Sequence, residues 1–355
     1  METESRSTTR DALSYPCGAR PENGALGEIV PGVQWISMPL PFSLGAINLW
    51  VLADGEGYTL VDTGVNSDEA MSVWNQLLAG PLAGRELQRV LVTHMHPDHI
   101  GFAGWLTRRF GCRLWMTRLE YLSCRMLASD TGRAAPDDGV AFYRRAGWDE
   151  SALNVYHSRF GNFGRMMSQL PDSYRRVCDG ERLRIGEYEW EVVVGAGHSP
   201  EHACLYDAQR KLLISGDQVL PRISSNISVH PTEPDADPLA EWLASLDMLR
   251  QRVPADVLVL PAHNEPFHGL HVRLDQLGAS IQRALERLRA GLQTPKRVVD
   301  TFALLFSRPI PFSDASMLSL ATGESVAHLN YLLRRGEISR ELDAEGVAWY
   351  CARPR

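Results

Sequence analysis

The segment THMHPDHIG, residues 93–101, constrains the fold of this chain more than any other feature of its sequence. It places His94, His96, Asp98 and His99 directly after the apolar run QRVLVT, which predicts a buried strand. The chain has eleven histidines in 355 residues, and three of them fall within the six positions 94–99. Imidazole nitrogens and a carboxylate oxygen at one strand end are the ligands that a zinc-like ion takes. A solvated polar loop has no reason to show this spacing, so the segment predicts a metal site.

Strand and helix patterns alternate around this segment. Between Gly32 and Asp62, short runs rich in β-formers are separated by Pro and Gly clusters, which predicts antiparallel strands. Apolar residues at helical spacing follow at 67–82, before the buried run that ends at Thr93. Strand signals resume later with EWEVVVGAG, ACLYD, KLLISGD and VLVLP. The second half therefore repeats the architecture of the first, and we expect an α/β fold.

Three segments depart from this alternation. The first 25 residues are polar and precede any apolar periodicity, so we expect a flexible, loosely ordered tail. Residues from about 118 to 176 show helical spacing in pieces, which predicts a helical insertion. The last sixty or so residues are typical of helix, helix and hairpin. We expect a tail at 1–25, a catalytic domain at 26–272, and a helical linker with a small winged-helix-like domain at 273–355.

Composition limits the partners and the compartment. The six cysteines are spread singly with no CxxC pair, which argues against a disulfide framework or a thiolate zinc site. The net charge is −7, and residues 295–355 carry eight basic and seven acidic side chains, so we expect no nucleic-acid partner. No apolar run approaches the roughly 18 to 20 residues of a membrane span, and the N-terminus lacks a signal-peptide core. We expect a cytoplasmic protein without membrane attachment, and a homo-oligomer stays open.

Four further motifs, each just after a predicted strand, accompany the histidine segment. They are Asp62-Thr63-Gly64, His198 in GHSPEH, Asp217 in ISGDQ and His263 in LPAHN. Together with HxHxDH, this ordered set resembles the metallo-β-lactamase superfamily from residue 33 to about 269. The resemblance implies a four-layer αβ/βα sandwich with metals in the cleft along one sheet edge. The helical tail and terminal module are most similar to the β-lactamase-like protein 2 and glyoxalase II-like branch.

The resemblance also implies two divalent metal ions, with zinc expected and iron or manganese as alternatives. One ion would take His94, His96 and His198, the other would take Asp98, His99 and His263, and Asp217 would bridge them. Asp98 would in addition act catalytically by orienting the hydroxide shared between the ions. Asp62 is expected to orient a metal histidine or loop backbone, and His202 to be a structural histidine or to support a ligand.

Substrate class is where the sequence leaves most open, and a thioester or ester of a small, acyl-CoA-like molecule is favoured. A thiolate leaves without a proton donor, and the sequence shows no donor. Arg222 and Asn226 could hold the carbonyl or phosphate of a carrier thiol, or could simply belong to a polar connection. Phe163 and Met167 are four residues apart and could share a helix face in an apolar lid, or could be the insertion's own core.

Other function classes stay open beside the thioesterase. Asp217 counts against antibiotic hydrolysis, because true β-lactamases of this fold lack an aspartate at that position. The alternatives are a metallo-phosphodiesterase or endoribonuclease, a lactonase, and a non-catalytic binding or sensor protein that kept the fold. The complete ligand set weighs against the last. Glu201 stands where the superfamily motif has a glycine, and the sequence does not show what this change does.

Overall fold

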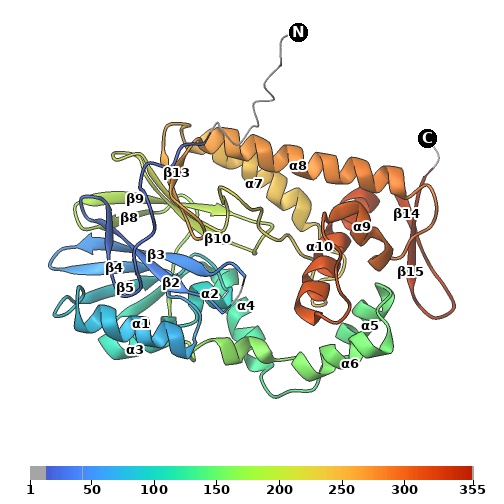
Figure 1. The fold of residues 1–355 in the computed structure, drawn as a ribbon, viewed down its shortest axis with the longest axis horizontal. Helices are drawn as coiled ribbons and strands as arrows, with labels where there is room; N and C mark the ends of the chain where they lie inside the picture. Colours follow the sequence, from blue (N-terminus) through green and yellow to red (C-terminus); the bar gives the residue numbers. More distant parts are fainter. Residues whose placement is uncertain (1–12, 42, 354–355) are drawn as a thin grey trace, which may run out of the picture.

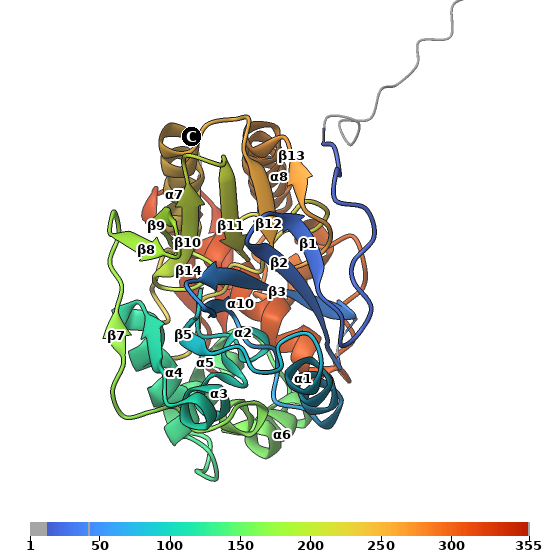
Figure 2. The same ribbon diagram turned by 90° about the vertical axis from the view of Figure 1, so that its left-hand side faces the viewer.

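The computed structural model describes residues 13–41 and 43–353. Two β-sheets face each other, and helices cover the outer face of each sheet (Figures 1 and 2). The α/β sandwich predicted from the sequence is therefore the observed fold. Within the described residues, none of the helices combines the length and the apolar character needed to cross a bilayer.

The first sheet has seven strands in chain order. The pairs from β1 to β4 are antiparallel, and those from β4 to β7 are parallel, with helices in the crossovers. Its strands are β1 (Gly27–Val30), β2 (Val33–Pro39), β3 (Ala46–Asp54), β4 (Gly57–Val61), β5 (Leu87–Leu91), β6 (Arg113–Met116) and β7 (Arg175–Arg176). The helices α1 (Asp68–Ala79) and α3 (Ala103–Phe110) cover its outer face, and the short α2 (Pro97–Ile100) precedes α3.

The second sheet has six strands in the order β13-β12-β11-β10-β9-β8. Only β11 and β12 pair in parallel, and α7 (Pro238–Arg252) lies between them in the chain. The strands are β8 (Arg182–Ile185), β9 (Tyr188–Gly195), β10 (His202–Asp207), β11 (Leu212–Gly216), β12 (Leu258–Pro261) and β13 (Phe267–His268). The long helix α8 (Leu270–Gly291) runs beside α7 over the outer face (Figure 1).

Alternate residues of the central strands fill different layers. In β3, Trp50 and Leu52 belong to the core between the sheets, whereas Leu49 and Val51 belong to the core under α1 and α3. Each fully buried side chain of this size contributes about 1.5–3 kcal/mol to folding. A strand that is buried on both faces has apolar side chains on both, which is why apolar and polar residues do not alternate in INLWVLAD.

The predicted helical insertion and the predicted order helix, helix, hairpin are both present. The insertion contains α4 (Arg118–Ser129), α5 (Asp137–Arg145), α6 (Glu150–Arg159) and the 3₁₀ helix η2 (Asn162–Met166). The C-terminal module contains the 3₁₀ helix η3 (Val299–Thr301), α9 (Phe302–Leu305), α10 (Ala315–Arg334), β14 (Ile338–Leu342) and β15 (Ala348–Ala352). The two parts touch, since the indole N–H of Trp148 donates to the hydroxyl of Thr322 at 2.9 Å. The expected boundary at residue 273 falls inside α8, and the winged-helix identity stays a prediction.

The segment 13–25 differs from the expected loose tail. Leu13 is buried in the core that also contains α7 and α8. The Ser14 N–H donates to the His268 carbonyl, and the His268 N–H donates back at 2.9 Å. A few anchoring residues produce no periodicity, so the sequence pattern could not reveal this attachment. Residues 1–12 lie outside the described part of the chain.

The expectation that Phe163 and Met167 share a helix face is wrong. η2 ends at Met166, and Met167 has an extended backbone. Met167 is buried in the core under the first sheet, where its Sδ lies 3.6 Å from Sγ of Cys124. Phe163 packs, partly buried, against the same core. The prediction failed because two residues four apart meet on one face only if the helix continues through both.

We therefore expect Met167→Ala to destabilise the fold rather than to open a lid. Loss of a buried methionine side chain lowers the free energy of unfolding by about 2–5 kcal/mol. Leu122→Ala serves as a control, because Leu122 lies on the insertion helix α4 and is 52% exposed. Its effect should stay within about 0.5 kcal/mol. Urea unfolding of both variants checks this, and equal midpoints would place Met167 outside the core.

Candidate metal centre

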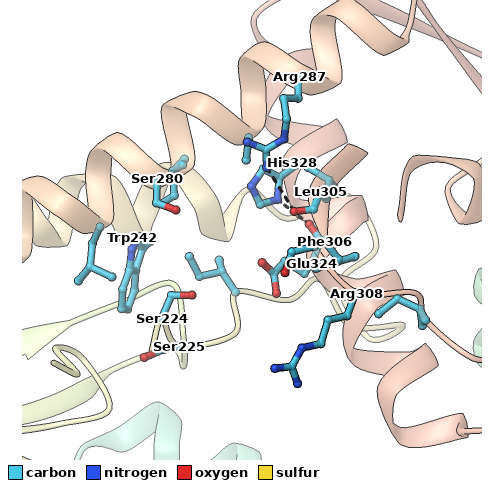
Figure 3. A pocket seen from close by; sticks show the side chains of 16 residues that line it. Ser224, Ser225, Trp242, Ser280, Arg287, Leu305, Phe306, Arg308, Glu324 and His328 are labelled. Atoms are coloured by element: carbon cyan, nitrogen blue, oxygen red, sulfur yellow. Dashed lines mark hydrogen bonds between the residues drawn. The ribbon is translucent and has the colours of Figure 1, made fainter. Parts of the chain in front are cut away.

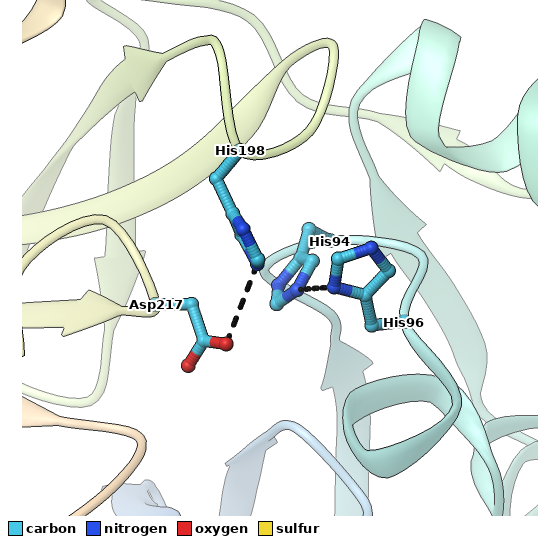
Figure 4. A group of neighbouring side chains, drawn as sticks. All are labelled: His94, His96, His198 and Asp217. Atoms are coloured by element: carbon cyan, nitrogen blue, oxygen red, sulfur yellow. Dashed lines mark hydrogen bonds and ion pairs between the residues drawn. The ribbon is translucent and has the colours of Figure 1, made fainter. Parts of the chain in front are cut away.

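The structure brings all seven predicted ligands together, each in a segment that follows a strand (Figure 4 shows four of them). β5 leads to the histidine segment, β9 to His198, β11 to Asp217 and β12 to His263. Pro97 begins α2 immediately after His96, and this turn carries Asp98 and His99 toward the other ligands. Gly101 follows because a Cβ there would lie 2.4 Å from the Gly64 carbonyl oxygen.

One group of ligands consists of His94, His96, His198 and Asp217. Its ligand atoms all lie within 4.8 Å of one another. Nε2 of His94 lies 2.9 Å from Nδ1 of His96, and Nε2 of His198 lies 3.4 Å from Oδ2 of Asp217 (Figure 4). Three nitrogens and one carboxylate oxygen at this spacing can hold one metal ion.

The second group consists of Asp98, His99 and His263, also within 4.8 Å. Nε2 of His263 lies 3.4 Å from Oδ2 of Asp98. Oδ1 of Asp217 lies 3.5 Å from Nε2 of both His99 and His263. The two oxygens of Asp217 thus face different groups, which is the position that a bridging carboxylate takes.

The ligand atoms themselves fit a metal. Nε2 of His99, His198 and His263 and Oδ1 of Asp217 are buried, and none has a hydrogen-bond partner among the described residues. A buried polar atom without a partner costs about 1–3 kcal/mol, and coordination of a cation would satisfy all four of these atoms. Nitrogen and carboxylate oxygen donors suit zinc, iron or manganese alike. The cluster is able to bind metal, while the identity and number of ions stay predictions.

Main-chain and carboxylate oxygens hold the outer nitrogens of three ligand histidines. Nδ1 of His198 lies 2.7 Å from the Asn226 carbonyl, and Nδ1 of His263 lies 3.1 Å from the Ala46 carbonyl. Nδ1 of His99 lies 2.7 Å from Oδ2 of Asp62. A proton on each Nδ1 satisfies these acceptors and leaves Nε2 free for a metal.

Asp62 contacts both a predicted metal histidine and the ligand loop. Besides His99, it accepts hydrogen bonds from the Thr93 N–H and the Thr93 hydroxyl, both at 2.8 Å. Asp62 has φ = 61°, a left-handed conformation that strains most side chains. The next residue, Thr63, donates its N–H to the His99 carbonyl at 2.7 Å. Asp62 and Thr63 therefore fix His99 at its ring and at its backbone.

His202 lies beneath the two groups. Its Nε2 accepts a hydrogen bond from the Asp217 N–H at 3.0 Å, and its ring stacks on His94 with centroids 4.8 Å apart. Burial lowers the pKa of His202 to about 3, so the neutral ring accepts at Nε2. Gly216 makes room for it, since a Cβ there would lie 2.5 Å from the His202 ring. His202 is thus a buried structural histidine that supports the Asp217 backbone.

Arg222 and Asn226 have contacts that differ from those expected. The Arg222 guanidinium pairs with Glu265 at 2.9 Å and lies over the ring of Tyr15, so internal partners already engage it. Asn226 acts through its carbonyl on His198, while its side-chain amide donates to Glu324 of α10 at 2.7 Å. Both side chains therefore have structural partners, and their contact with a substrate stays a prediction.

A cavity of about 350 Å³ lies on segment 224–227 between α7, α8 and the C-terminal module (Figure 3). Ser225 lines it and donates its hydroxyl to the Asp217 carbonyl. Glu324 also lines it, and burial raises the pKa of this carboxyl to about 7. The C-terminal module therefore contacts the segment that supports Asp217 and His198.

Asn48, which was not among the residues predicted from the sequence, fixes the loop of His263. Its amide donates to the Pro261 carbonyl at 2.8 Å and to the Asn264 carbonyl at 2.7 Å. The indole N–H of Trp35 donates to its Oδ1 at 2.8 Å. The available signal was an amide inside an otherwise apolar strand, because a buried amide needs partners of this kind.

The two groups differ in their affinity for protons. Burial, reinforced by neighbouring histidines, holds the pKa of His94 well below its usual range and lowers that of His96 to about 3. Burial also tends to lower the pKa of His99. The carboxylates of Asp62, Asp98 and Asp217 outweigh this effect and raise the His99 pKa well above its ordinary value. The His263 pKa is raised in the same way, against burial, by Asp217 and Asp98.

A pH dependence of metal binding follows. A metal must displace the proton from a histidine, and this competition is weak at His94 and His96 but strong at His99 and His263. As the pH falls from about 8 to about 5, we expect the Asp98, His99 and His263 group to lose metal first. Cobalt titrations followed by absorbance at several pH values check this. If the His94, His96 and His198 group lost its metal first, the prediction that protons compete most strongly at His99 and His263 would be wrong.

Two known protein families match successive parts of the chain. Residues 43–263 match the family described as the metallo-β-lactamase superfamily. The chain belongs to the metallo-β-lactamase superfamily. Residues 285–353 match a second family, described as the metallo-β-lactamase-like C-terminal domain. The superfamily core and the separate C-terminal module that the sequence indicated are therefore both matched, and the chain is a superfamily hydrolase with a cluster able to bind metal.

Individual proteins of known structure or name are also similar to this chain. A β-lactamase domain protein from Burkholderia ambifaria, solved by crystallography, is 39% identical with a TM-score of 0.88, covering 97% of this chain and 99% of that one. The probable metallo-hydrolase YqjP of Bacillus subtilis (strain 168) is 26% identical over 84% of this chain and 91% of the relative. The atrochrysone carboxyl ACP thioesterase of Aspergillus fumigatus is 25% identical over 66% of this chain and 41% of the relative.

Proposed function

We propose that this superfamily member is a binuclear, metal-dependent hydrolase of thioesters, with a small acyl-carrier molecule as its substrate. The observation that carries the proposal is Asp217, whose two oxygens face two separate groups of buried ligand atoms. Two divalent ions bound there supply Lewis acidity at the substrate carbonyl and a water molecule that is acidic enough to act at neutral pH.

The residues of this chain have defined tasks in such a reaction. Asp217 and the histidines hold the two positions at a fixed separation. The Asp98 side chain is 15% exposed, so it can contact a water molecule in the cleft and accept its proton. Asp62, Asn226 and Ala46 keep the histidine rings in one orientation, which removes reorganisation from the reaction.

The leaving group favours a thioester over an amide. Among the described residues, the seven ligands contact histidines, aspartates, a threonine and main-chain groups, and no lysine or tyrosine is hydrogen-bonded to them. An amine needs such a donor, whereas a thiolate leaves at neutral pH without one. The relative named as an acyl-carrier-protein thioesterase supports the same choice.

Direct assay tests the proposal. Protein reconstituted with zinc, manganese or iron is first analysed for metal, with two ions per chain expected. The same samples are then offered short and long acyl-coenzyme A thioesters, the matching oxygen esters, a lactone, and a single-stranded RNA. Thioester cleavage in the metal-loaded sample, absent after chelation, is the expected result. Cleavage of RNA or lactone without thioester turnover would give the lead to the phosphodiesterase or the lactonase.

A further inference from the structure

Glu120 is a fully buried carboxylate that no part of the proposed reaction uses. It lies in the first turn of α4, at the start of the helical insertion. Its exposed fraction is 0%, and within residues 13–41 and 43–353 no Lys or Arg pairs with it. Burial raises the pKa of Glu120 above its ordinary value. A buried acidic group of this kind needs specific hydrogen-bond donors.

Both oxygens of Glu120 accept hydrogen bonds from the two loops that carry ligands. The Met95 N–H donates to Oε2 at 2.8 Å, and Met95 stands between His94 and His96. The Glu201 N–H donates to Oε1 at 2.8 Å, and Glu201 follows His198 by three residues. One side chain therefore spans the gap between the loops of the first ligand group.

The second of these loops also holds the start of α4. The Glu201 carboxylate accepts the Leu119 N–H at 2.8 Å, and the Thr117 hydroxyl donates to the Glu201 carbonyl at 2.7 Å. Thr117, the residue before the helix, makes no side-chain cap of its own. A carboxylate at a helix N-terminus satisfies a free N–H and interacts favourably with the helix dipole. The glutamate at the superfamily's glycine position thus fixes the helix that presents Glu120.

We propose that Glu120 is a positioning residue that holds the His94–His96 loop and the His198 loop at the separation required for one metal ion. The proposal rests on the ligand groups of the proposed function. The helical insertion is then part of the metal centre's support, and not only a cover beside it. Supporting contacts of this type typically change metal affinity by about 10- to 100-fold when they are lost.

Glu120→Gln separates this role from simple space filling. Glutamine has nearly the same volume but only one acceptor oxygen, so its NH₂ group must face one of the two N–H donors. One loop is then released while the packing of α4 is kept. Circular dichroism and thermal unfolding of the variant show whether the fold is retained.

The measurement is cobalt affinity in two single-group backgrounds. His263→Ala damages the second group and leaves the three-histidine group, while His198→Ala damages the first group and leaves Asp98, His99 and His263. We expect Glu120→Gln to weaken cobalt binding about 10- to 100-fold in the His263→Ala background and less than about threefold in the His198→Ala background. Glu189→Gln, at a residue of an exposed ion pair, is the charge-matched control and should change neither affinity.

The outcomes separate this proposal from the function it rests on. No cobalt binding by the unaltered protein would overturn the metal site itself. Unchanged affinity of Glu120→Gln in the His263→Ala background would overturn the positioning role alone. Equal weakening in both backgrounds would also overturn it, because a general structural defect acts on both groups.

Discussion

Asp217→Ala is expected to lower turnover by about a thousandfold or more and to reduce metal content by at least one ion per chain. Each of its oxygens lies near a different ligand group, so alanine would remove a ligand from both of the proposed metal positions. Loss of transition-state stabilisation by a metal amounts to several kcal/mol, and about 4 kcal/mol corresponds to a thousandfold. Elemental analysis and the thioester assay measure the two effects on the same sample.

The fold should survive this change. Without metal, the Asp217 carboxylate stabilises a cluster of histidines, but its backbone N–H remains bonded to His202 in the variant. Asp256→Ala is the matched control, because Asp256 pairs with Lys211 at the surface and should alter neither metal nor activity. A variant of Asp217 that fails to fold would make this residue primarily structural. If the Asp217→Ala variant kept full activity, Asp217 would not bridge two metal ions.

The position of the metal centre could be predicted because strand ends determine it. Each motif follows an apolar run, and neighbouring parallel strands end at the same edge of a sheet, so Asp62 and His94 meet after β4 and β5 of the first sheet, and Asp217 and His263 meet after β11 and β12 of the second. The packing of the two sheets then brings His94 and Asp217 together. The HxHxDH segment by itself predicted a metal site, whereas the other ligands and their division into two groups were implied by the resemblance to the superfamily. The two sheets and their helices follow from the same apolar runs.

Contacts made by single side chains with distant segments could not be predicted. Arg222 was predicted as an anion ligand by its position, but its contacts with Glu265 and Tyr15 were not foreseen. Asn226 supports His198 through its carbonyl, which every residue type possesses. Glu120 lies on a helix with ordinary amphipathic spacing, and only the tertiary structure shows its two donors. Sequence patterns report periodicity and local chemistry, whereas these roles depend on partners 25 to 207 positions away.

The role of the whole C-terminal module could likewise not be predicted from the sequence. Its balanced charge argued against a nucleic-acid-binding face, but indicated no other role for the module. In the structure, Glu324 of α10 binds the Asn226 side chain, and Asn226 in turn holds His198. A helix late in the chain is therefore two hydrogen bonds from a candidate ligand. Substitution of Glu324 should therefore alter the position of Asn226 and, through it, the orientation of His198.

Asp62→Asn should weaken metal binding by the Asp98, His99 and His263 group about 10- to 100-fold at pH near 8, with a similar loss of turnover. Asparagine tolerates the left-handed backbone at this position, so the fold should be retained. Its oxygen can still accept from Thr93, but its NH₂ group then faces Nδ1 of His99 and favours the wrong tautomer. Cobalt titration of the variant measures the loss.

The same substitution has a second consequence of opposite sign. The Asp62 carboxylate is the largest of the charges that raise the His99 pKa, so its removal lowers that pKa and weakens proton competition. Metal affinity of the variant should therefore be lower at high pH and should fall less steeply as the pH decreases. Asp54→Asn, at an aspartate bonded to Arg89 away from the ligands, is the control. If the variant bound metal more weakly but with an unchanged pH dependence, Asp62 would act on His99 only by holding its ring in place. If metal affinity did not change, Asp62 would not support the metal site.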